Sequence, residues 1–466
     1  MKSRPSIGLI LLRAEWFDTV VALPALVQAV QSDQDAIVAL FQDNFELDHT
    51  WVINSTPSLD RSAKEIRSSQ VDLFVLVFQV WAEDAYLLPL LRSIAGRPLA
   101  VWCYQPWQRL PEKISFIEVL RGSGPVGTFE GLGTLRNLAA PYFFTYGSPA
   151  DGRVIEDLLV AARGAQVWRA LRSARFGLLP SRNEQMQSTF VDEFRLMADI
   201  GPQVQMLSVA ELKSAADCLP EREVMDYLEH LRQEYPRHGV SDETLALAAR
   251  ASLGLAHLAV DHHLDVLSIN DISTELHATF GLRPCLYPPM LYQANIPLGL
   301  EGDLGAAAAL FVLHRLVGSP LLFVEFWFWD MEENLLVGGH AGPQDPRLAH
   351  PGGAWISLDY EYAQSDSTTG AHLQFVARPG RVTLFQLRGT TQGWQALLAG
   401  GEALASAPRL EGYPHAVIRL DAPLEEFLPR VAQVGSTQHW IMAYGDVLAE
   451  VEAFCRLAGV PVEVID

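Results

Sequence analysis

The sequence predicts an α/β protein with two Rossmann-like, flavodoxin-like domains followed by a β-rich, barrel-like domain. Three observations predict this fold class. Short apolar runs alternate with amphipathic stretches in the first third, the same rhythm restarts near residue 175, and β-type runs separated by Gly and Pro take over from residue 320. A chain of 466 residues is too long for one hydrophobic core. We therefore predict three domains: residues 1–172, 173–319 and 320–466.

The first predicted domain has the pattern of a doubly wound parallel sheet. Strands are expected at SIGLILL (6–12), VDLFVLVFQV (71–80) and PLAVWCYQ (98–105), and helices at residues 19–30 and 85–96. The run at 71–80 is almost entirely apolar, which is typical of a strand covered on both faces.

Polar residues follow two of these strands. Gln79 ends the second run, and Gln105 ends the third, close to Tyr104 and Trp107. Ligands of parallel α/β sheets bind beyond the carboxyl ends of the strands, so we predict that Gln79 and Gln105 contact a substrate. No GxGxxG follows the first strand, so a dinucleotide site is not expected.

The second predicted domain repeats the α/β pattern. It begins at RFGLLPSRNEQ (175–185), and a strand is expected at 264–271. Helices are expected at 186–201, 221–235, 242–263 and Leu304–Val317, the last with Glu301 and Asp303 at its start. In the third predicted domain, apolar runs at 321–330, 334–340, 355–362, 372–387 and 415–420 favour a mostly antiparallel sheet or barrel. A final helix is expected at 446–459.

Composition restricts the partners. The net charge of −21 argues against nucleic acid. No apolar run approaches the ~20 residues of a membrane span, and Ile7–Leu12 is shorter than the apolar part of a signal peptide. Four widely spaced cysteines show no zinc or disulfide pattern, so we predict reduced thiols in a cytoplasmic protein.

The stretch FVEFWFWDMEENLLVGGH (323–340) carries the strongest chemical signal. Glu325 and Asp330 stand among aromatic residues, and a buried carboxylate is costly unless it has a partner or a metal. His340 follows two glycines, which let the backbone approach a ligand closely. Together with Glu301 and His439, these residues offer two carboxylates and two imidazoles, which suit a divalent ion such as Mn²⁺ or Co²⁺.

Each residue also has a structural interpretation, which spacing alone leaves open. Glu301 could favour a helix N-terminus, where negative charge is stabilising. Glu325 could lie on an edge strand facing water, and His340 and His439 could be hydrogen-bonded structural histidines. Asp261, His262 and His263 resemble a metal cluster but end a predicted helix, where a polar cap is the expected structure.

The four positions and their surroundings resemble the L-arabinose and L-fucose isomerase family, more closely the arabinose isomerase branch. LEGDLGAAAAL is similar to the family's E-G-D segment, FVEFWFWD to its F-M-E-D-Y-T-Y-H strand, NLLVGGH to its L-V-L-G-x-H strand and GSTQHW to its G-G-A-H-H turn. The resemblance runs through most of the chain and keeps the family's order. It implies that Glu301, Glu325, His340 and His439 bind one divalent metal, most simply Mn²⁺, with Co²⁺ and Mg²⁺ as alternatives.

The resemblance also implies an activity. It is metal-dependent aldose–ketose isomerisation of a free pentose or 6-deoxyhexose through an ene-diol, with Glu301 and Glu325 exchanging acid and base roles. Trp327 and Asp330 are expected near the sugar. The family builds its pocket between subunits, which predicts a homo-oligomer, a trimer or a hexamer.

The sequence departs from the family beside the ligands. Asp330 stands where arabinose isomerases usually have His, and Trp440 replaces the second His of their H-H pair. The sugar specificity of arabinose isomerase is therefore not carried over. Two other functions stay open: a non-catalytic sugar-binding sensor derived from the isomerase fold, and a sugar epimerase.

Overall fold

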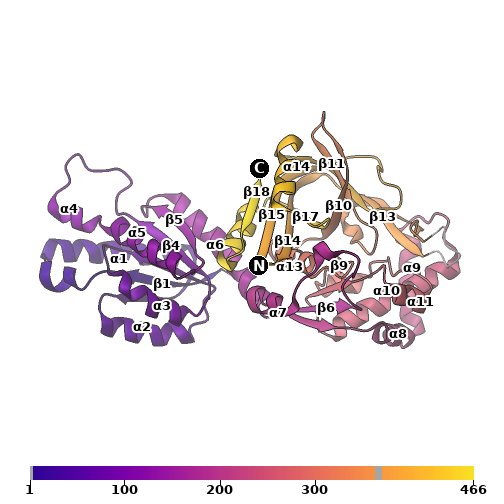
Figure 1. The fold of residues 1–466 in the computed structure, drawn as a ribbon, viewed down its shortest axis with the longest axis horizontal. Coiled ribbons are helices and arrows are strands. Elements are labelled where there is room, and N and C mark those ends of the chain that lie inside the picture. The colour runs from indigo at the N-terminus through magenta and orange to yellow at the C-terminus, as the bar shows by residue number, and fades with distance from the viewer. Residues whose placement is uncertain (1–3, 22, 363–369) are drawn as a thin grey trace. The chain divides into compact units, whose positions relative to one another are not determined.

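The computed structural model describes residues 4–21, 23–362 and 370–466, which form two compact units (Figure 1). The first unit contains the described residues up to Arg169 and Glu452–Val460. The second contains Ala170–Val451 and Pro461–Asp466. The predicted division of the chain into three domains, with a boundary at residue 319, stays a prediction.

The first unit is a parallel five-stranded sheet in the order β2-β1-β3-β4-β5. Its strands are β1 (Ser6–Leu12), β2 (Glu46–Ile53), β3 (Leu73–Phe78), β4 (Leu99–Tyr104) and β5 (Phe143–Gly147). Side chains alternate along each strand, so Leu9 and Leu11 join one core and Ile10 and Leu12 the other. Both faces are thus apolar, which explains the nearly uninterrupted hydrophobic strands.

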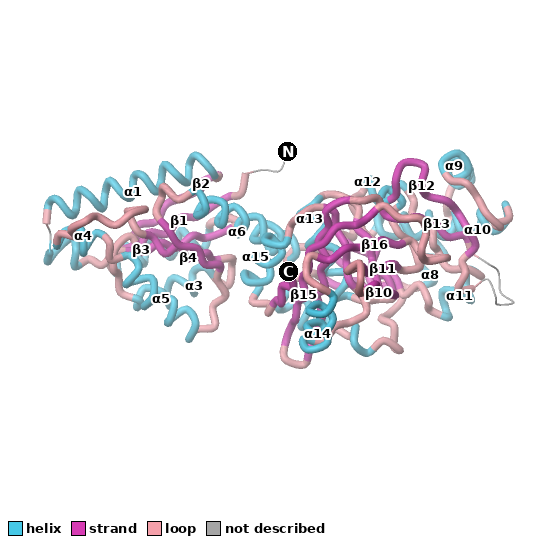
Figure 2. Tube along the Cα trace, turned by 90° about the horizontal axis from the view of Figure 1, so that it is seen from above, coloured by secondary structure: helices cyan, strands magenta, loops and turns pink. Residues whose placement is uncertain are grey.

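Helices cover both faces of this sheet (Figure 2). α1 (Pro24–Asn44) and α6 (Gly152–Leu171) pack on one core, while α2 (Thr56–Ser68), α3 (Leu87–Ile94) and α5 (Gly124–Asn137) pack on the other. A short helix, α4 (Phe116–Arg121), precedes α5. Leu457 from the C-terminal helix α15 (Leu448–Ala458) belongs to the core of α1 and α6.

The second unit begins with a parallel four-stranded sheet in the order β7-β6-β8-β9. Its strands are β6 (Arg175–Leu179), β7 (Gln203–Met206), β8 (Val266–Ile269) and β9 (Leu298–Leu300). The accompanying helices are α8 (Val209–Asp217), α9 (Glu221–Glu234), α10 (Asp242–Asp261), α11 (Thr274–Phe280), α12 (Pro289–Gln293) and α13 (Leu304–Val317).

The prediction of a single helix at 186–201 is wrong. The segment instead forms three short helical pieces, at Gln187–Thr189, α7 (Glu193–Arg195) and Leu196–Ile200. The side chain of Asp192 accepts the backbone N–H of Arg195 and so starts a new helix in the middle of the predicted one.

The remaining strands form a nine-stranded sheet in the order β12-β13-β16-β11-β10-β17-β14-β15-β18. Their bounds are β10 (Leu321–Asp330), β11 (Leu335–Gly339), β12 (Ala349–Leu358), β13 (Ala371–Ala377), β14 (Gly380–Thr390), β15 (Gly393–Leu404), β16 (His415–Leu420), β17 (Trp440–Tyr444) and β18 (Val462–Ile465), with α14 (Leu424–Val434) between β16 and β17. An additional antiparallel pairing of β15 with β16 closes the six strands from β16 to β15 into a barrel. The predicted α/β class with a barrel-like C-terminal part is confirmed, whereas the finer Rossmann-like description stays a prediction.

None of the helices in the described part of the chain combines the length and apolarity that crossing a bilayer requires. The cytoplasmic location stays a prediction.

Candidate metal centre

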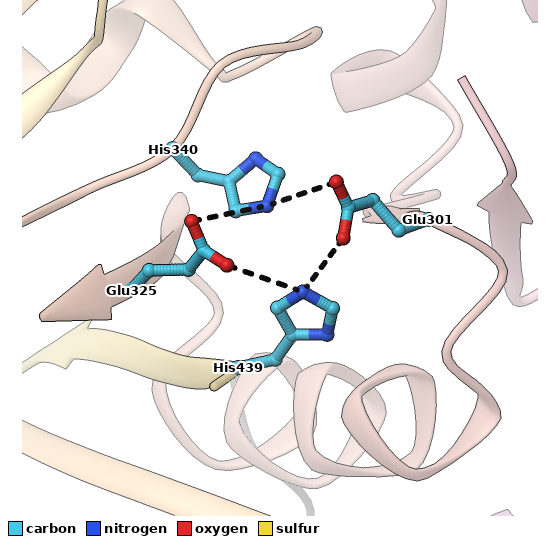
Figure 3. Close-up of side chains that lie close together, drawn as sticks. All are labelled: Glu301, Glu325, His340 and His439. Carbon is cyan, nitrogen blue, oxygen red and sulfur yellow. Dashed lines mark hydrogen bonds and ion pairs between the residues drawn. The ribbon is translucent and has the colours of Figure 1, made fainter. Parts of the chain in front are cut away.

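Four side chains far apart in the sequence meet in the second unit (Figure 3). Glu301, Glu325, His340 and His439 each offer one ligand atom, and these atoms all lie within 4.8 Å of one another. Nε2 of His439 is 3.1 Å from Oε2 of Glu301 and 3.9 Å from Oε1 of Glu325. Nε2 of His340 is 3.9 Å from Oε1 of Glu301 and 4.0 Å from Oε2 of Glu325.

Three of the four residues lie on, or directly next to, neighbouring barrel strands. On β10, Glu325 pairs with Gly339 of β11, and His340 follows that glycine. On the other side, Val324 pairs with Trp440 of β17, so His439 lies just before the strand and level with Glu325. The strand order β11-β10-β17 therefore places both imidazoles beside one carboxylate.

Residue alternation along β10 explains why a carboxylate sits in this apolar strand. Leu322 and Val324 point into the barrel core, and Phe323 and Glu325 point to the opposite face. The ring of Phe323 contacts both imidazoles edge-on, with centroids 5.2 Å from His340 and 4.8 Å from His439. The apolar residues thus position the histidines, and Glu325 faces them.

The fourth residue, Glu301, comes from the tight turn between β9 and α13. Its backbone is left-handed, with φ of 55°, and Gly302 follows with φ of 69°. Asp271, at the end of β8, accepts the backbone N–H of Glu301 at 3.2 Å. The N-terminus of α13 is capped by Asp303, which accepts the N–H of Ala306. Helix capping is therefore not the role of Glu301.

Hydrogen bonds aim Nε2 of each histidine at the carboxylates. Nδ1 of His340 donates to the carbonyl oxygen of Ala341 at 2.7 Å, and Nδ1 of His439 donates to Oδ2 of Asp303 at 2.9 Å. A metal-binding imidazole characteristically donates its other N–H to a carbonyl or carboxylate in this way. Asp303 thus orients a candidate ligand, a contact that the sequence did not predict because it placed Asp303 only at the helix start.

The four residues fit a divalent ion. Metal–ligand bonds of about 2.1 Å place adjacent ligand atoms about 3–4 Å apart. The nitrogen–oxygen distances within this cluster, 3.1 to 4.0 Å, agree with that spacing. Glu301, His340 and His439 are at most 7% exposed. Nε2 of His340 is buried and has no hydrogen-bond partner among the described residues, although its Nδ1–H is satisfied. A buried cluster of this composition can bind a divalent metal.

The surroundings move the pKa values in opposite directions. Burial favours a raised pKa for Glu301, but the hydrogen bond from His439 and the nearby imidazoles outweigh it and lower the pKa. Burial raises the pKa of Glu325 despite the same imidazoles. Burial favours a lowered pKa for His439, yet its bonds to Asp303 and Glu301 raise the pKa to about 9. Without metal, His439 therefore holds a proton near neutral pH.

A pocket of about 390 Å³ opens beside Glu325, and its lining includes Trp327, Ser436 and Gln438. The β10–β11 register shifts between Phe326 and Phe328, which makes Trp327 the bulged residue. Its Nε1–H donates to the carbonyl oxygen of Gly339 at 3.0 Å, which holds the indole in place. The space beside Gly339 itself is filled by protein rather than ligand, because a Cβ there would lie 2.5 Å from the carbonyl oxygen of Pro414.

The other predicted substrate residues lie outside the cluster. Asp330 lies at the β10–β11 turn, where its carboxylate accepts the N–H groups of Glu332 and Glu333. Gln79 and Gln105 lie in the first unit, after β3 and β4. Gln79 is 2% exposed, and neither atom of its amide has a partner among the described residues. The substrate-binding roles of all three residues stay predictions.

Comparison with known proteins identifies the class of enzyme. No family model matches the chain. The chain is 22% identical over 401 residues to the sulfoquinovose isomerases of Priestia aryabhattai and Priestia megaterium, covering 85% of this chain and 86% of each relative. It is 24% identical over 337 residues to the sulfoquinovose isomerase of Alkalicoccus urumqiensis, covering 71% and 74%.

The chain is accordingly an enzyme, a sugar isomerase that interconverts an aldose and a ketose, and this predicted enzyme class is confirmed. The predicted closeness to the arabinose isomerase branch stays a prediction.

Proposed function

We propose that the protein is a metal-dependent aldose–ketose isomerase whose Glu301, Glu325, His340 and His439 hold one divalent ion, most simply Mn²⁺. The convergence of these four ligand atoms within 4.8 Å carries the proposal. Oxygen and imidazole donors without a thiolate favour Mn²⁺ and related ions such as Co²⁺. When bound, the ion acts as a Lewis acid that stabilises negative charge developing on the sugar oxygens.

The two glutamates differ in access to the sugar. Glu325 lines the pocket of about 390 Å³, and its side chain is 21% exposed. The side chain of Glu301 is only 9% exposed, and Glu301 does not belong to the lining of this pocket. We assign to Glu325 the transfer of the carbon-bound proton between C2 and C1. Glu301 assists the proton transfer between the two oxygens, so the pair retains the acid and base roles that an ene-diol mechanism needs.

The pocket also offers a surface for the rest of the sugar. The indole of Trp327 is 42% exposed and is held by its bond to Gly339. We propose that it packs against the apolar face of the substrate. Separately, we propose that Gln79 and Gln105 bind sugar hydroxyls, because each follows the carboxyl end of a parallel strand, β3 and β4 respectively.

The proposed substrate is a free aldose of pentose or 6-deoxyhexose size. Sulfoquinovose, which the relatives' name specifies, is a 6-deoxyhexose with a sulfonate on carbon 6. It is therefore the first candidate to test beside L-arabinose and L-fucose. The particular sugar is proposed on the relatives' name alone.

The decisive experiment is a substrate screen with metal-free protein and added Mn²⁺. Sulfoquinovose, L-arabinose, L-fucose and other aldoses are incubated separately, and products are separated by chromatography. We expect ketose from at least one of them, formed only with metal. Formation of a C2-epimeric aldose instead of a ketose would identify an epimerase. Tight sugar binding without turnover would identify a sensor.

A further inference from the structure

A buried ion-pair network lies behind Glu301 and has no part in the proposed chemistry. Arg283 is 1% exposed, and its Nε and Nη2 donate to both carboxylate oxygens of Asp359, at 2.9 and 2.7 Å. Its Nη1 donates to Oδ2 of Asp271 at 3.3 Å. Both aspartates are 1% exposed. A charge network buried so completely is costly to desolvate, so it is by itself weak evidence for a stabilising role.

The network touches the proposed metal centre at Glu301. Oδ1 of Asp271 accepts the N–H of Glu301, while Oδ2 of the same carboxylate is held by Arg283. Glu301 adopts a left-handed backbone that a residue with a Cβ rarely adopts. The N–H bond to Asp271 holds this conformation, which determines where the carboxylate of Glu301 points.

Asp271 also lies against the segment that follows His340. A Cβ on Gly342 would lie 3.0 Å from Oδ2 of Asp271, and Gly342 has φ of 95°. The carbonyl oxygen of Gly342 accepts Nε2–H of the fully buried His372 at 2.9 Å. One aspartate therefore contacts the backbone beside two of the proposed ligands.

The opposite end of the network reaches β10, the strand that carries Glu325. Nη1 of Arg283 is 2.6 Å from Oε2 of Glu361, and the hydroxyl of Tyr413 donates to Oε1 of Glu361 at 2.7 Å. The ring of Tyr413 packs on Trp327, with centroids 5.2 Å apart. A continuous series of contacts thus joins the β9–α13 turn to β10 and β11.

We propose that Asp271 and Arg283 are positioning residues that hold Glu301 in its left-handed turn and thereby set the geometry and affinity of the metal centre. They touch neither substrate nor metal. This inference rests on the proposed metal-dependent function. Outer partners of metal ligands typically contribute about 10- to 100-fold to metal affinity, so the effect is measurable without turnover.

Two substitutions separate the parts of the contact. Asp271→Ala removes both the acceptor for the N–H of Glu301 and the charge that pairs with Arg283. Asp271→Asn has the same size and keeps one acceptor oxygen for the N–H of Glu301, but it removes the charge and replaces the oxygen that faces Arg283 by an NH₂ donor. Asp421→Asn is the matched control, because Asp421 pairs with Arg381 on the surface, where their side chains are 37% and 39% exposed, respectively.

Mn²⁺ binding to the metal-free full-length variants is measured by titration calorimetry, and folding is checked by circular dichroism and thermal melting. We expect about 10- to 100-fold weaker binding for Asp271→Ala, a smaller loss for Asp271→Asn and no change for the control. At saturating Mn²⁺, kcat should fall in both Asp271 variants with KM little changed, because the substrate pocket is not altered.

A purely structural role predicts a different result. Both Asp271 variants would melt at lower temperature, while their folded form bound Mn²⁺ with unchanged Kd, and this would overturn the inference. If Asp271→Ala does not fold, Asp271→Asn decides: an unchanged Kd and kcat refute the positioning role. Glu301→Gln is measured in parallel. If it weakens Mn²⁺ binding but neither Asp271 variant does, only the positioning role fails. If neither does, the proposed metal centre fails with it.

Discussion

Replacing Glu325 by Gln tests the central assignment with the least structural change. The two side chains have the same size. In Glu325, Oε2 lies 4.0 Å from His340 and Oε1 lies 3.9 Å from His439, and the amide of Gln keeps only one of these two oxygens. The amide cannot cycle a proton. We expect isomerase activity to fall by about 10²- to 10⁴-fold, the usual contribution of general acid–base catalysis.

The same substitution has a calculable effect on metal-linked stability. Metal that binds only the folded protein stabilises it by about 2.7 kcal/mol when its concentration is a hundred times Kd. A hundredfold weaker Kd in Glu325→Gln would remove most of that stabilisation at the same Mn²⁺ concentration. The metal-free variant should be no less stable than the metal-free parent, because burial disfavours the charged form of Glu325 and raises its pKa.

Turnover of the identified substrate and thermal melting with and without Mn²⁺ measure these two effects. Asp330→Asn is the comparison variant, because Asp330 lies outside the cluster of four ligands and its carboxylate accepts backbone N–H groups of the hairpin turn. We expect a mild effect there. Full turnover of Glu325→Gln together with inactive Asp330→Asn would refute the assignment and make Asp330 the catalytic carboxylate.

Three further outcomes are expected. A chelator should abolish activity and lower the melting temperature, and Mn²⁺ or Co²⁺ should restore both; activity that survives complete metal removal would contradict the metal-dependent mechanism. Mn²⁺ affinity should rise with pH up to about 9, because the ion must displace the proton held by His439. Calorimetry at pH 6.5, 7.5 and 8.5 measures this, and a Kd for Mn²⁺ that does not change with pH would contradict it. Light scattering at micromolar concentration should give a trimer or hexamer, and a monomeric parent protein would contradict the predicted oligomer. Trp329 is 55% exposed at the aromatic end of β10, so Trp329→Ser should weaken the assembly if this end forms an interface.

The pH dependence also applies to the metal-free fold. The pKa of His439 is about 9 in the folded state and about 6.5 in an unfolded chain. Its protonated contacts with Asp303 and Glu301 therefore stabilise the metal-free protein fully below about pH 6.5, and this stabilisation is lost as the pH rises through about 9. The metal thus becomes easier to bind over the range in which the metal-free fold loses this support.

Local patterns in the sequence were sufficient to predict several elements of the site. The predicted strand at 321–330 and helix at Leu304–Val317 have the same bounds in the structure, because a continuous apolar run and an Asp at the helix start are local signals. The spatial meeting of Glu301, Glu325, His340 and His439 was predicted from the family resemblance, since spacing alone left a structural interpretation open for each residue.

Other features depend on contacts that no local pattern encodes. Asp271 and Glu301 are 30 positions apart, and Arg283 and Asp359 are 76 apart, so their bonds appear only once the chain is folded. The local sequence around Asp271 indicated only that an aspartate ends a predicted strand, in LSIND (267–271), and gave no sign of its bond to Glu301. The attachment of residues 452–460 to the first unit is equally non-local, because it joins the last helix to a core formed by the first third of the chain.

Glu325 and Asp330 show why composition could not separate a catalytic carboxylate from a structural one. Both stand in the same aromatic strand, five positions apart. Pairing of Glu325 with Gly339 places it between the two histidines, whereas Asp330 lies at the end of the strand, where the turn offers two backbone N–H groups. Only the register of β10 with β11 and β17 distinguishes the two positions.

A one-residue slip of β10 would turn Glu325 toward the barrel core and Phe326 toward the histidines, because successive side chains face opposite sides. The packing of Leu322 and Val324 in that core therefore does more than stabilise the barrel, since it fixes which acid reaches the histidines.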